Sequence, residues 1–192
     1  MSSHRGAAVI GVIVALLVLA LAGTAVARTR ARSPKTVSTS TWVTSVCKDF
    51  TRWDHGLSAR ALPLPATDPI AGKAAIAAFV GEASRATDTL SRGIAAAKIP
   101  SLKHGTTIAS SFAQAARKLR HSYRVAKTRA AALPTDDPTA FATAAQTLAT
   151  DLERAGATLN TSLQKITSGD RSGKLAKAFR TTKACKAAPA RT

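Results

Sequence analysis

The sequence predicts an all-α fold: an up-down helical bundle of four main helices plus a short C-terminal helix, preceded by a signal or transmembrane segment. Apolar side chains recur every three or four residues through most of the chain, and prolines interrupt this pattern at short intervals. No stretch alternates with a period of two, so strands are not predicted. Residues 7–27 carry no charge, and a run of this length is typical of either a membrane span or a signal-peptide core.

These patterns divide the chain into segments. Residues 1–27 are predicted to be a signal peptide or transmembrane anchor, 28–38 a basic linker, 39–187 the helical bundle domain and 188–192 a flexible tail. The small side chains of Ala25 and Ala27 form an A-x-A cleavage site. The basic residues that follow oppose export, which favours a retained or slowly cut anchor. They are Arg28, Arg30, Arg32 and Lys35.

The first two helices are bounded by prolines. The first begins at Thr39 and stops before Pro63. Its apolar positions are Val43, Val46, Cys47, Phe50, Trp53 and Leu57. The second begins at Pro69, where Asp68 supplies a capping side chain, and Pro100 stops it. Its inner positions are Ile76, Val80, Ala83, Thr87, Leu90, Ile94 and Ala97.

The third helix is predicted to begin near Ser101 and to stop at Pro134. Its inner side includes Ile108, Phe112, Ala115, Leu119, Ala126 and Leu133. The fourth repeats the acid-then-proline start at Asp137 and Pro138, and Gly169 ends it. Its inner side is Phe141, Ala145, Leu148, Leu152, Ala155, Leu159, Leu163 and Ile166. A short fifth helix then carries Leu175 and Phe179.

The two cysteines, Cys47 and Cys185, lie near opposite ends of the predicted domain. A disulfide between them would join the first and last helices and stabilise an alanine-rich core by about 5 kcal/mol. Disulfides persist outside the reducing cytosol, so this pairing predicts a domain on the outer side of the membrane or a secreted one. The alternative is two buried free thiols in a domain that faces the cytoplasm.

The net charge of +18 predicts an anionic partner. On the third helix, spacings of three and four residues place basic side chains on the side opposite the apolar residues. This predicted anion-binding face consists of Arg117, Arg120, Arg124 and Lys127. An anionic lipid, a wall polymer or a membrane-protein partner fits it. A merely solvated surface is the alternative, and nucleic acid fits the charge but lacks a stacking platform of aromatic side chains.

No motif indicates a reaction, a cofactor, a metal or a small-molecule substrate. The stretch 169-GDRSGKL-175 lacks the spacing and the preceding strand of a phosphate-binding loop, so a turn between helices is expected. The ten carboxylates include no pair three or four residues apart, and the four histidines are scattered. We therefore expect no enzyme.

Several short motifs give the chain a family resemblance. They are a W-x-x-x-V-C-x-x-F pattern at Trp42, Val46, Cys47 and Phe50, alanine-rich helices broken at Ile-Pro and Leu-Pro, and a closing Ala184-Cys185-Lys186. In these features the chain resembles small exported helical-bundle proteins, often lipoproteins, of high-GC bacteria. The resemblance implies a bond between the two cysteines and an envelope location, but no activity. Thr24 stands where a lipoprotein carries its acylated cysteine, so no lipid attachment is expected there.

Overall fold

A computed structural model describes residues 35–58 and 68–186. The chain divides into two units, residues 1–33 and 34–192, and the described residues belong to the second. Helices account for about 82% of the structure, so the prediction of an all-α fold is confirmed. The predicted signal or membrane segment, its cleavage site at Ala25 and Ala27, and the tail 188–192 lie outside the described residues.

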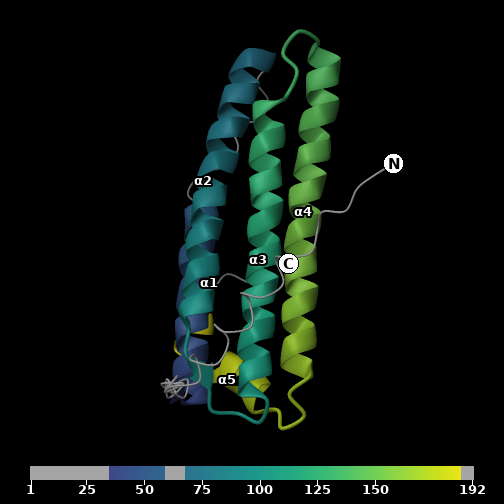
Figure 1. The fold of residues 1–192 in the computed structure, drawn as a ribbon. Helices are drawn as coiled ribbons and strands as arrows, with labels where there is room; N and C mark the ends of the chain where they lie inside the picture. The colour runs from purple at the N-terminus through teal and green to yellow at the C-terminus, as the bar shows by residue number, and fades with distance from the viewer. Residues whose placement is uncertain (1–34, 59–67, 187–192) are drawn as a thin grey trace, which may run out of the picture. The chain divides into compact units, whose positions relative to one another are not determined.

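The described part of the chain contains helices and one very short pair of strands (Figure 1). The helices are α1 (Thr39–Ser58), α2 (Pro69–Ala96), α3 (Gly105–Ala131), α4 (Pro138–Ser168), α5 (Lys174–Thr181) and α6 (Lys183–Lys186). The strands are β1 (Thr36–Val37) and β2 (Ile99–Pro100), which pair in parallel.

Two aspartates begin α2 and α4 as the sequence predicts. The side chain of Asp68 accepts a hydrogen bond of 2.9 Å from the backbone N of Ile70. Asp137 accepts equivalent bonds from Thr139, at 2.8 Å, and Ala140, at 3.3 Å. Each cap satisfies amide groups that have no partner inside the helix, and the proline that follows needs none.

The third helix begins later than predicted, at Gly105 instead of near Ser101. Just before this stretch β2 pairs with β1, and the Ser101 backbone N extends the pairing by donating to Val37 O at 2.8 Å. His104 then turns the chain with a left-handed φ of 64°. A strand pair two residues long produces no alternating pattern, so the sequence gives no sign of it.

The long helices α2, α3 and α4 lie side by side with α3 in the middle (Figure 1). The α1 helix packs on α2, and α5 and α6 pack on α1. Since α1 is 20 residues long and α2 is 28, α1 covers only part of its neighbour.

The core consists of two hydrophobic clusters. The larger includes residues of α1, α2, α3, α4 and α5 and is centred on Trp42, whose ring meets that of Phe112 edge-on at 5.0 Å between centroids. The smaller joins α2, α3 and α4 around Val80 and Leu148. Of the 31 residues of α4, only Leu148 and Leu159 are buried. The α4 helix is therefore the least covered of the long helices.

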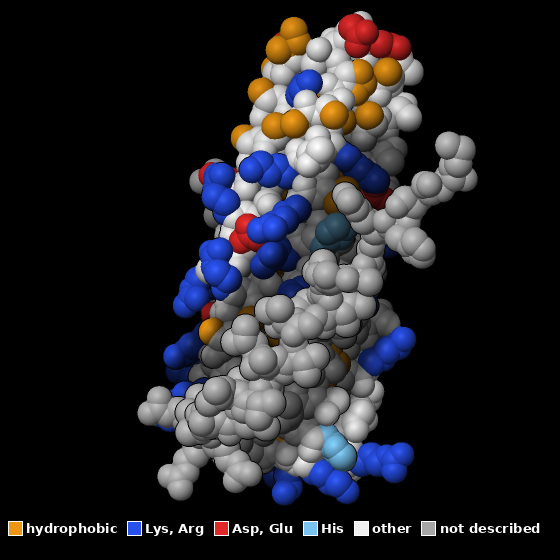
Figure 2. Space-filling view, viewed as in Figure 1, with side chains coloured by type: hydrophobic (Ala, Val, Ile, Leu, Met, Phe, Trp, Pro, Cys, Tyr) orange, Lys and Arg blue, Asp and Glu red, His pale blue; other side chains and the backbone are white. Residues whose placement is uncertain are grey.

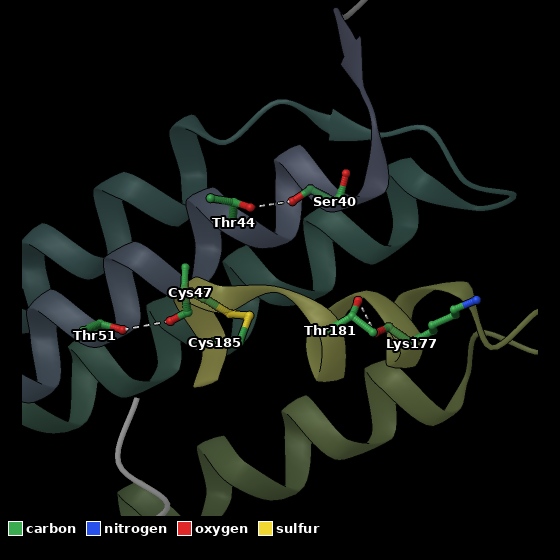
Figure 3. Close-up of a disulfide and its surroundings, with 8 residues drawn as sticks. Ser40, Thr44, Cys47, Thr51, Lys177, Thr181 and Cys185 are labelled. Carbon is green, nitrogen blue, oxygen red and sulfur yellow. Dashed lines mark hydrogen bonds between the residues drawn. A yellow bond between two sulfur atoms is a disulfide. The ribbon is translucent and has the colours of Figure 1, made fainter. Parts of the chain in front are cut away.

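A disulfide joins Cys47 of α1 to Cys185 of α6, across a sequence separation of 138 residues (Figure 3). The predicted pairing is thus confirmed, and the alternative of two free thiols is wrong. Beside the bond, the hydroxyl of Thr51 donates to the backbone O of Ala184 at 3.5 Å. The C-terminal turn is therefore held against α1 by both covalent and polar contacts.

Candidate anion-binding face

The four predicted cations lie together on one side of α3. Arg117, Arg124 and Lys127 are exposed and Arg120 is half-buried. On the opposite side of the same helix, Phe112 is 2% exposed. We call the four residues Arg117, Arg120, Arg124 and Lys127 the basic stripe. The three- and four-residue spacing places them on one face, as it does in any α-helix.

An acid of the neighbouring helix meets two of these cations. Asp88 of α2 accepts hydrogen bonds from Arg124 Nη2 at 3.1 Å to Oδ1 and 3.4 Å to Oδ2. Arg120 Nε lies 3.4 Å from the same Oδ1. Within the described residues, neither Arg117 nor Lys127 has an ion pair. The basic stripe therefore keeps a net positive charge after its pairing with Asp88.

Most of the remaining acids serve local structure. Asp68 and Asp137 cap helices. Three further pairs or clusters lie along the helices: Asp49 with Arg52, Glu82 with Arg85, and Asp151 with both Arg129 and Arg154. Among the charged side chains in view in Figure 2, Lys and Arg predominate over Asp and Glu, in keeping with 28 basic and 10 acidic residues in the chain.

The turn at 169-GDRSGKL-175 joins α4 to α5, as predicted. Asp170 accepts hydrogen bonds from the Ser172 hydroxyl at 2.6 Å and from the Leu175 backbone N at 2.7 Å. These bonds lower the pKa of Asp170 below its ordinary value of 3.8. Asp170 thus binds groups of its own turn, and its bond with Leu175 satisfies a backbone N–H in the first turn of α5.

Asp49 is the second carboxylate with a shifted pKa. Burial raises its pKa above the ordinary value of 3.8, while the charge and hydrogen bond of Arg52 oppose the shift. In the described ranges, no group of three or more His, Cys, Asp or Glu side chains lies close enough together to hold a metal ion.

The sequence did not indicate a groove that runs between α3 and α4. Its volume is about 330 Å³. Leu119 and Ala126 of α3 and Leu148, Leu152 and Leu159 of α4 provide apolar lining. Lys118, His121, Arg129, Asp151 and Arg154 provide the ionisable lining. The periodicity predicts which side of each helix these residues occupy. It does not predict the depth of the groove, which depends on how closely the two helices pack.

Comparison with known protein families, with curated proteins and with solved structures finds no match to this chain. Among the helices of residues 35–58 and 68–186, none is both long and apolar enough to cross a membrane.

Proposed function

We propose that this chain is a non-enzymatic protein of the cell envelope that uses the basic stripe to bind anionic lipid, an anionic wall polymer or a membrane-protein partner. In this proposal residues 39–187 form an up-down helical bundle. Residues 1–27 either tether the bundle to the outer side of the membrane or are removed to release it.

One observation carries the proposal: the basic stripe places four cations on one side of α3, and Asp88 pairs with only two of them, Arg120 and Arg124. Each Lys or Arg near an anionic membrane surface contributes about 1 kcal/mol of attraction. Such a surface attracts by its field and needs no enclosed site. The covalent link between Cys47 and Cys185 supports the outer side of the membrane, because a disulfide is stable there.

The test compares two full-length variants in zwitterionic nanodiscs, each with four cations changed to glutamine. One changes the basic stripe. The control changes four exposed lysines that have no ion pair among the described residues, namely Lys48, Lys98, Lys103 and Lys165. Binding to phosphatidylglycerol vesicles is measured over a series of salt concentrations.

We expect the stripe variant to bind on the order of a thousandfold more weakly than wild type, because four charges of about 1 kcal/mol each are lost. The control variant should lose much less, although its net charge is the same. Equal losses would mean that binding follows total charge and that the basic stripe is only a solvated surface. Duplex DNA serves as the competitor, because a preference for DNA over vesicles would support the alternative of a cytoplasmic-facing protein that binds nucleic acid. Tyr123 of α3 is buried, with 8% of its surface exposed. Its ring is therefore not available to stack on a nucleic-acid base beside the basic stripe.

A further inference from the structure

The groove between α3 and α4 combines an apolar lining with positive charge. Its volume of about 330 Å³ falls at the lower end of the range of small-molecule sites, about 300–1,000 Å³. Leucines from both helices line it, including Leu119, Leu152 and Leu159. A narrow apolar groove between two antiparallel helices suits an extended hydrocarbon chain better than a compact polar molecule.

The charges of the groove do not balance. Arg129 of α3 and Arg154 of α4 both form ion pairs with Asp151, Arg154 at 2.9 Å. Two guanidinium groups therefore share one carboxylate, and Lys118 adds a further cation to the lining. The donors that remain on the two arginines are available to an anionic head group, which arginine binds in a forked geometry.

The packing of α4 indicates that this side of the helix is incomplete. The helix contacts mainly α3, with a minor contact to α5, and Leu152 remains half-buried in the groove. An acyl chain lying against the half-buried Leu152 and Ala155 would remove their remaining apolar surface from water, and this removal favours binding.

We propose that the groove binds a single-chain anionic amphiphile, with its acyl chain between α3 and α4 and its head group at Arg129 and Arg154. The groove residues are not those of the basic stripe, so this site is distinct from the proposed docking face. The basic stripe is suited to an extended anionic surface, whereas the groove takes one lipid-like molecule.

The experiment uses the full-length chain in its own membranes and a palmitate analogue with a photoreactive diazirine in its chain. After illumination, the labelled tryptic peptides are identified by mass spectrometry. We expect label on peptides 130–154 and 155–165, which contain the groove-lining leucines of α4. Excess palmitate should remove this label, while hexadecanol, which lacks the negative charge, should not.

The variant Ala155→Leu fills the groove, because Ala155 is part of its lining. Displacing about two methylenes of the ligand should reduce the labelling about tenfold. The control Ala157→Leu adds the same side chain at an exposed position of the same helix and should leave the label unchanged. Circular dichroism checks that both variants keep their helices.

Three results would overturn the proposal: label that Ala155→Leu leaves unchanged, competition by hexadecanol equal to that by palmitate, or a dimer that Ala155→Leu dissociates. The last would identify the groove as a contact between two copies of the chain. The quadruple stripe variant separates the two proposals, since it should lose vesicle binding and still take up the palmitate label.

Discussion

Asp88 of α2 and Arg124 of α3 lie 3.1 Å apart, and the same carboxylate oxygen lies 3.4 Å from Arg120. One acid therefore reduces the field of half the basic stripe. Because all three side chains are at least partly exposed, the pairing contributes little to stability, about 0–1 kcal/mol. Its main consequence concerns the charge that the stripe presents to a partner.

The first prediction follows from this pairing. Replacing Asp88 with asparagine should strengthen binding to anionic vesicles about fivefold, because one opposing charge of about 1 kcal/mol is removed. The matched control is Glu153→Gln, which changes the net charge equally from an exposed position on α4. Vesicle titrations at low and high salt measure both. An equal gain from the two variants would show that position relative to the stripe is irrelevant.

The second prediction concerns the disulfide between Cys47 and Cys185. Replacing either cysteine with serine should lower the free energy of unfolding by about 5 kcal/mol, because the closed loop restricts the unfolded chain. Denaturant unfolding measures the change. Replacing both cysteines should lower the free energy of unfolding no more than replacing one. Reductant should lower the free energy of unfolding of wild type and leave that of the variants unchanged.

The third prediction uses the same cysteines to locate the domain. In intact cells, a bulky membrane-impermeant maleimide should fail to label the chain until reductant is added, and denaturing lysis alone should not expose a thiol. This outcome would support the outer side of the membrane, where a disulfide persists. Free labelling after lysis without reductant would place the domain in the cytosol and favour nucleic acid as partner.

The fourth prediction compares two glycines. A Cβ on Gly105 would overlap the backbone O of Pro100, whereas one on Gly156 would meet nothing within 4 Å. Gly105→Ala should therefore force β2 away from α3 and destabilise the fold by about 1–3 kcal/mol. Gly156→Ala should stabilise it by about 0.5–1 kcal/mol, because the unfolded chain loses freedom. Thermal unfolding that ranks the two variants in the opposite order would contradict the packing at the start of α3.

The fifth prediction concerns pH. The pKa of Asp170 is lower in the folded chain than its ordinary 3.8, so its ionised form favours folding. This contribution is complete above the unfolded pKa and is lost as pH falls through the folded pKa. Asp170→Asn should lower the melting temperature at neutral pH and reduce its fall below about pH 4. Parallel pH profiles for the two proteins would show that Asp170 does not contribute.

Local signals in the sequence predict most of the helical domain. Asp68 and Asp137, each followed by a proline, mark the starts of α2 and α4, because capping depends on residues within one turn. Helical periodicity likewise places the basic stripe on one side of α3. The pairing of Thr36 with Ile99 joins residues far apart in the sequence, so no local pattern indicates it or the later start of α3.

The sites depend on contacts between helices, which the sequence reveals less well. The spacing of Arg120 and Arg124 predicts their common side, but not that Asp88 of another helix lies between them. The groove next to Leu152 likewise depends on the distance between α3 and α4. Both features depend on how side chains of different helices pack together, and the periodicity within one helix does not predict that packing.

The covalent bond from Cys47 to Cys185 also determines how the domain responds to mechanical force. A tension applied between a point before Thr36 and a point after Lys186 would pass along α1 to Cys47, cross the two sulfur atoms and leave through α6. The 138-residue separation between the cysteines includes all of α2, α3, α4 and α5, so the covalent path of this force does not run through them. The basic stripe and the groove both lie in that loop, so the disulfide prevents a force on the chain ends from extending the backbone that carries them.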